Sequence, residues 1–126
     1  MIIGIVGSRR RDSEADYKLC EEAFLKIYKE GDTIVSGGCR QGGDRFAEII
    51  AKKRNIPIKI HYPDKSKLDP VKMEQNPRWA YAEINYARNT LIANDSDVII
   101  AVVAPDRKGG TEDTLKKAKG KQIILV

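Results

Sequence analysis

The stretch TIVSGGCRQGGD, residues 33–44, runs from a short apolar segment into four glycines and then toward a segment with helical periodicity. An apolar strand, a turn and a helix form the repeating unit of α/β proteins. Glycine allows a backbone to approach a ligand closely, and the start of a helix offers free N–H groups and partial positive charge. A second stretch of this kind is Gly109-Gly110-Thr111. Two such turns in one small protein indicate a site for a phosphate-bearing ligand.

Outward from this stretch, apolar runs alternate with amphipathic segments along the whole chain. We predict strands at residues 2–6, 33–36, 58–61, 97–103 and 122–126. We predict helices at residues 13–30, 45–54, 79–93 and 111–119. Ser13 is the expected N-cap of the first helix, with Asp16 completing a capping box.

The alternation predicts a Rossmann-like α/β fold, a three-layer α/β/α sandwich around a five-stranded parallel sheet of order 3-2-1-4-5. In that order the chain reverses direction across the sheet between the first and fourth strands, where ligands bind at the carboxyl ends of the strands. The turns after the first, second and fourth strands are therefore expected to converge on one crevice.

The segment 62–78 holds three of the five prolines, among many lysines and aspartates. We interpret it as a long loop, and loops of this length are commonly functional. The hypothesis is a mobile lid or a partner surface.

The composition favours a soluble globular protein with a single domain at residues 1–126: 41% of the residues are hydrophobic, 33% are charged and the net charge is +5. The apolar run at residues 2–6 is too short for a signal peptide or a membrane span, so a cytoplasmic location is expected, with no membrane partner. The last strand would be an exposed apolar edge, which favours a homodimer.

The chain has two cysteines, Cys20 and Cys39, and one histidine, His61. Their spacing matches no zinc motif, so we predict neither a metal site nor a cofactor. Cys20 lies on the apolar side of the first predicted helix and is expected to be buried. Cys39 lies within the glycine stretch.

Several turn residues are candidates for ligand contact, each with a structural alternative. Ser8 and Arg9 can grip a phosphate or form a simple turn. Asp44 can bind a ligand hydroxyl or cap the second helix, and Thr111 can bind a ligand or cap the fourth. The predicted ligand-binding residues are Gly7, Ser8, Arg9, Ser36, Gly37, Gly38, Arg40, Gly42, Gly43, Asp44, Arg88, Asn89, Gly109, Gly110 and Thr111. The sequence has neither the dinucleotide-binding glycine fingerprint nor a Walker lysine motif, which disfavours the standard NAD and ATP sites.

These motifs, in this order, resemble the SLOG superfamily. The resemblance is carried by Gly7-Ser8-Arg9, by residues 36–44 with Ala47-Glu48, by Arg88-Asn89 with Leu91-Ile92-Ala93, and by Gly109-Gly110-Thr111. It is strongest toward the YpsA-like and DprA/Smf-like branches and more distant toward the LOG phosphoribohydrolases. It implies a Rossmann-like fold that binds nucleotides or molecules derived from them. In the LOG branch a glutamate of the last motif is catalytic, and Thr114 occupies that position here.

Three functions follow from these observations. The first is binding of a nucleotide or nucleotide-derived ligand, with sensing as one use. The second is hydrolysis of the N-glycosidic bond of a nucleoside monophosphate, for which Glu112, Asp113 and Asp44 are the candidate catalytic carboxylates. The third is DprA-like binding of single-stranded DNA through Arg9, Arg10, Arg11 and Arg40. Stacking platforms for bases are scarce, since aromatic residues make up 6% of the chain.

Overall fold

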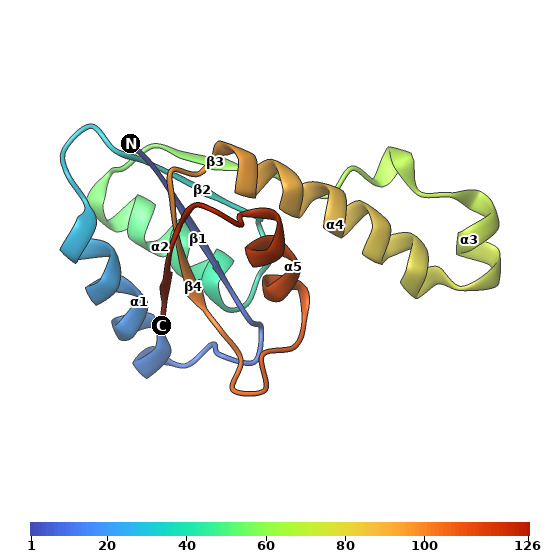
Figure 1. Cartoon of the computed structure of the whole chain (residues 1–126), viewed down its shortest axis with the longest axis horizontal. Coiled ribbons are helices and arrows are strands. Elements are labelled where there is room, and N and C mark those ends of the chain that lie inside the picture. The colour runs from blue at the N-terminus through green and yellow to red at the C-terminus, as the bar shows by residue number, and fades with distance from the viewer.

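A parallel sheet of five strands forms the centre of the protein, in a computed structural model that describes residues 1–126 (Figure 1). The strands are β1 (Ile2–Gly7), β2 (Thr33–Ser36), β3 (Ile58–Ile60), β4 (Val98–Val102) and β5 (Gln122–Leu125). Their order is β3-β2-β1-β4-β5. The predicted sheet, its order and the reversal between β1 and β4 are therefore confirmed.

Helices cover both faces of the sheet, as the strand alternation requires. On one face, α1 (Glu14–Ile27) and α2 (Gly43–Arg54) pack on side chains such as Ile3 and Ile5. On the other face, α4 (Pro77–Asp95) and α5 (Gly110–Lys117) pack around Val6. Successive residues of β1 thus point to opposite layers, and both layers are apolar because both faces are buried.

The segment 62–78 is largely helical, so the predicted long loop is wrong. It contains a short 3-10 helix (Lys65–Lys67), then α3 (Pro70–Gln75) and the start of α4. Two of its prolines begin helices, because Pro70 and Pro77 occupy first-turn positions where the missing N–H costs nothing. Asp69 caps α3 by accepting hydrogen bonds from the N–H groups of Val71 and Lys72. With the first half of α4, this segment forms an arm that projects from the body of the protein (Figure 1).

The helix starts beside the glycine turns also differ from the prediction. The N-cap of α2 is Gly42 and that of α5 is Gly109, both with positive φ (76° and 117°) and neither with a side-chain cap. Asp44 and Thr111 therefore lie inside the first turns and cap nothing. By contrast, the capping box of Ser13 and Asp16 at the start of α1 is present as predicted, although α1 ends at Ile27, before residue 30.

The start of α2 packs directly on the end of β1. A Cβ atom added to Gly43 would lie 2.3 Å from the carbonyl carbon of Val6 and 2.4 Å from the amide nitrogen of Gly7. Only a residue without a side chain permits this approach. The contact fixes the glycine turn beside the carboxyl end of β1, which is where the candidate site lies.

None of the helices combines the length and the apolar character that crossing a bilayer requires.

Candidate functional site

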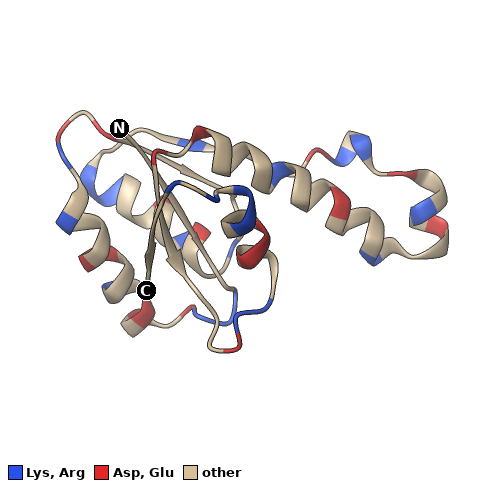
Figure 2. Ribbon diagram, viewed as in Figure 1, with Lys and Arg blue, Asp and Glu red and all other residues tan.

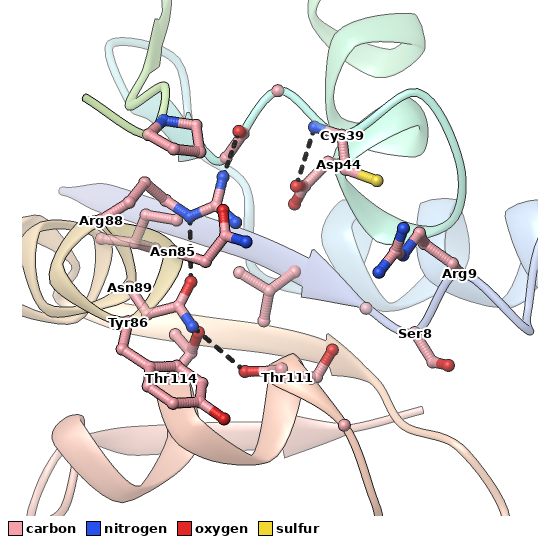
Figure 3. A pocket seen from close by; sticks show the side chains of 18 of the residues that line it. Ser8, Arg9, Cys39, Asp44, Asn85, Tyr86, Arg88, Asn89, Thr111 and Thr114 are labelled. Carbon is pink, nitrogen blue, oxygen red and sulfur yellow. Dashed lines mark hydrogen bonds between the residues drawn. The ribbon is translucent and has the colours of Figure 1, made fainter. Parts of the chain in front are cut away.

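A cavity of about 850 Å³ opens at the carboxyl ends of β1, β2 and β4. Its walls come from the turn after β1, the glycine turn after β2, the loop before α5 and the side of α4 (Figure 3). Gly7, Arg9, Gly38, Gly110 and Thr111 are among the lining residues. The three turns predicted from the sequence therefore meet at one cavity, at the position where the strand order reverses.

The rim of the cavity carries cations without counter-charges. Arg9, Arg40 and Lys108 line the cavity and are exposed, and none of them belongs to an ion pair of the protein. The neighbours of Arg9 differ, because Arg10 forms a bidentate pair with Asp106 (2.6 and 3.0 Å) and Arg11 pairs with Asp16. Figure 2 shows basic residues on the adjoining loops that follow β1 and β4. Of the three consecutive arginines, only Arg9 remains free to meet an anion.

Ion pairs also hold the loops of the rim in place. Arg10 donates to the carbonyl oxygen of Lys108 as well as to Asp106, which ties the loop after β4 to the turn after β1. Asp12 accepts hydrogen bonds from the N–H of Gly42 (2.7 Å) and from Arg45 (2.8 Å). Both interactions lower the pKa of Asp12, so the carboxylate stays ionised and keeps the glycine turn against the turn after β1.

The amino end of α5 faces the cavity with its backbone. Gly109, Gly110 and Thr111 line the cavity, and the first N–H groups of a helix have no partner within it. The two acids that follow do not line the cavity: Glu112 accepts two hydrogen bonds from Arg107 (both 2.9 Å), and Asp113 pairs with Lys117 (2.9 Å). Their charges are compensated locally, so the helix end retains its attraction for an anion.

Asp44 is the single acidic residue of the cavity lining and is 7% exposed. One carboxylate oxygen contacts the hydroxyl of Ser36 (2.9 Å), and the other accepts a hydrogen bond from the N–H of Cys39 (3.0 Å). Burial raises the pKa of Asp44, while the nearby Arg88 opposes this rise. Asp44 therefore organises the glycine turn and also presents a carboxyl group to the cavity.

Arg88 and Asn89 connect the two glycine turns through α4. Arg88 donates to the carbonyl oxygen of Gly37 and to the side-chain oxygen of Asn89, and Asn89 donates to the carbonyl oxygen of Gly110 (3.3 Å) and to Asp113 (3.1 Å) (Figure 3). Asn89 is 5% exposed, so this network lies at the back of the cavity. It holds the walls at a fixed separation.

The predicted site residues divide into two groups. Ser36, Gly42, Gly43, Glu112 and Asp113 do not line the cavity, and the others do. Ser36 is fully buried and contacts Asp44, while the two glycines serve close packing. The cavity is also lined by residues that are outside the predicted ligand-binding set: Val6, Arg10, Cys39, Pro63, Ala82, Asn85, Tyr86, Ile92, Lys108 and Thr114. Four of these lie on α4, and Ala82, Asn85 and Tyr86 share one helical face with the predicted Asn89, a spacing that is visible in the sequence.

The two cysteines differ in environment, which gives a testable prediction. Cys20 is fully buried and burial raises its pKa to about 12, whereas Cys39 is half-buried at the cavity. At pH 8 a disulfide-based thiol reagent should modify Cys39 in the folded protein and Cys20 only after unfolding. Peptide mass mapping would locate the label. Modification of Cys20 at the same rate as Cys39 in the native protein would contradict the structure.

The fold and the position of the cavity define a Rossmann-like α/β protein with a ligand-sized cavity at the switch point of its sheet. The structure is similar to that of the molybdenum cofactor binding protein from the phototrophic bacterium Rippkaea orientalis. The TM-score is 0.70 at 25% sequence identity, over 98% of this chain and 74% of that chain. No protein-family model matches the sequence, and no curated protein matches it.

Proposed function

We propose that this protein binds a phosphate-bearing heterocyclic molecule of the nucleotide class, with the phosphate at the rim of the cavity. The observation that carries the proposal is the meeting of unpaired Arg9, Arg40 and Lys108 with the amino end of α5 at one cavity. The three cations come from three different loops, so an anion bound between them would be contacted from several sides.

The charge and size of the cavity agree with such a ligand. Exposed cations and free helix amides favour a phosphate, because charge-assisted hydrogen bonds are stronger than neutral ones. A volume of about 850 Å³ lies within the range of small-molecule sites and accommodates a mononucleotide. The carboxylates of α5 point elsewhere, and Thr114 stands at the cavity wall, so α5 supplies no acid for hydrolysis there. These features favour binding over the hydrolytic alternative.

A second candidate ligand is the molybdenum cofactor, because the similar protein from Rippkaea orientalis is named as a molybdenum cofactor binding protein. The organic part of that cofactor is a pterin that carries a phosphate, and the basic rim fits this phosphate as well as that of a nucleotide. The protein has no cluster of three or more His, Cys, Asp or Glu side chains that could hold a metal ion. In this hypothesis any metal would be held by the organic part of the cofactor itself.

The proposal can be tested by thermal unfolding in the presence of nucleotides. Nucleoside 5′-monophosphates at millimolar concentration should raise the melting temperature, because a ligand that binds only the folded state stabilises it; at 100 times Kd the gain is about 2.7 kcal/mol. The matching nucleosides, which lack the phosphate, should give a much smaller shift. A panel in which neither nucleotides nor phosphorylated pterins raise the melting temperature would contradict the proposal.

A further inference from the structure

The inner end of the cavity has a different character from its rim. Asp44 lies there, as the only acid among the lining residues and nearly fully buried. The apolar side chains of Val6 and Ile92, 4% and 1% exposed, also line this part. Apolar side chains beside one buried carboxyl group suit a ring system whose edge is polar.

The carboxyl group of Asp44 has acceptor capacity that the protein does not use. An ionised carboxylate accepts about four hydrogen bonds. Within the protein, Asp44 is contacted by the hydroxyl of Ser36 on one oxygen and by the N–H of Cys39 on the other, and the N–H of Gly37 also interacts with the carboxylate. Arg88 adds none, because its hydrogen bonds go to Asn89 and to the carbonyl oxygens of Gly37 and His61. The single hydroxyl hydrogen of Ser36 also has the carbonyl oxygen of Ile5 within reach (2.6 Å), so the carboxylate of Asp44 retains acceptor capacity for donors of a ligand.

The position of the phosphate decides which part of the ligand meets Asp44. In a nucleotide the ring lies at the end of the molecule opposite the phosphate. With the phosphate among Arg9, Lys108 and the start of α5, the ring extends toward the inner wall, where Asp44 lies across the cavity from α5 (Figure 3). A ring edge that faces a carboxylate must present hydrogen-bond donors. A hydrogen-bond acceptor of the ring at that place would be repelled by the carboxylate and left without a partner.

We propose that Asp44 recognises two adjacent donors on the ligand's ring, the ring N–H and the exocyclic amino group of a 2-amino-4-oxopyrimidine. Guanine and pterins both carry this edge, and the two donors match the two oxygens of one carboxylate. Adenine does not, since its ring nitrogen at the corresponding place is an acceptor. The inference rests on the proposed function, in which the phosphate binds at the rim, and it adds the class of ring that the inner end selects.

The test compares ligands that share a phosphate and differ at the ring edge. Calorimetric titration should give tight binding of guanosine 5′-monophosphate or of neopterin monophosphate. Inosine 5′-monophosphate, which lacks the amino group, should bind at least about tenfold more weakly, as expected for loss of a hydrogen bond to a charged group. Adenosine 5′-monophosphate should bind more weakly still. The tighter binder of guanosine 5′-monophosphate and neopterin monophosphate shows whether the natural ligand carries a guanine or a pterin ring.

Variants of the protein add a second readout. Asp44→Asn keeps an acceptor for the N–H of Cys39 but replaces the other oxygen by a donor, so the preference for guanosine over inosine monophosphate should fall to about twofold or less. Asp69→Asn, on the arm and able to cap α3 as before, should leave the preference unchanged. If Asp44→Asn does not fold, as judged by circular dichroism, the comparison of ligands with the unaltered protein still decides.

The outcomes separate this inference from the proposed function. Equal affinities for guanosine, inosine and adenosine monophosphates would overturn the assignment of Asp44 while leaving phosphate binding intact. Weaker binding of 2′-deoxyguanosine monophosphate, together with equal affinities for the three bases, would assign Asp44 to the sugar and also overturn it. Absence of binding by all the nucleotides and by the pterin would overturn both.

Discussion

Gly43→Ala is expected to destabilise the protein by about 3 kcal/mol, at the upper end of the range for overpacking a well-packed site. The added methyl group would lie 2.3 Å from the backbone of Val6, and backbone cannot move aside as a flexible side chain can. Either α2 must shift away from β1 or the end of β1 must bend, and both changes disturb the glycine turn of the site. Chemical denaturation followed by circular dichroism would measure the loss, and ligand binding should weaken in parallel.

Gly110→Ala is the matched control for this experiment. Gly110 also opens a helix after a glycine N-cap with positive φ, but an added Cβ atom there has no neighbour within 4 Å. Its effect on the free energy of unfolding should stay within about 0.5 kcal/mol, as for most substitutions away from packed positions. Equal losses for the two variants would show that α2 does not pack on β1 as described.

Arg9→Ala should weaken binding of a nucleoside monophosphate about 10- to 100-fold, because a hydrogen bond to a charged group contributes about 1.5–3 kcal/mol. Arg9 lines the cavity and has no acidic partner in the protein, so its replacement breaks no internal ion pair. The free energy of unfolding should therefore remain unchanged. Calorimetric titration of both proteins at the same ionic strength would measure the difference, which should shrink as salt screens the charge.

Arg78→Ala provides the control for Arg9→Ala. Arg78 is an exposed arginine on the first turn of α4, in the projecting arm, and it does not line the cavity. The two variants lower the net charge of the protein by the same amount, so a general attraction for anions would weaken equally in both. The role assigned to Arg9 is wrong if nucleotide affinity is unchanged in Arg9→Ala, or if it falls to the same extent in Arg78→Ala.

The strand pattern and the glycine turns were sufficient to predict the sheet and the convergence of its loops. Runs such as residues 2–6 and 98–103 are apolar throughout because parallel strands between two helical layers are buried on both faces. Once five such strands alternate with helices, the handedness of the crossovers restricts their order. The carboxyl ends of β1, β2 and β4 then have to lie together, so the turns that follow them share one cavity.

Other features depend on contacts that a linear sequence does not display. The sequence predicts Pro70 and Pro77 to lie in a loop, whereas the structure places both in the first turn of a helix, a position that proline also favours. The three consecutive arginines look alike in the sequence, yet distant partners, Asp106 for Arg10 and the carbonyl oxygen of Val103 for Arg11, leave only Arg9 unpaired. The sequence also makes Glu112 a candidate acid, but in the structure the loop before α5 places Arg107 against its carboxylate.

Nuclear magnetic resonance offers the most direct test of phosphate binding at the cavity rim. The ¹⁵N-labelled protein would be titrated with guanosine 5′-monophosphate and, in parallel, with guanosine. We predict that the nucleotide causes its largest amide shifts at residues 7–10, 37–44 and 108–111, and that guanosine leaves the first and last of these segments nearly unchanged. Shifts that cluster on the arm or on the edge strands, or equal shifts with and without the phosphate, would contradict the proposed function.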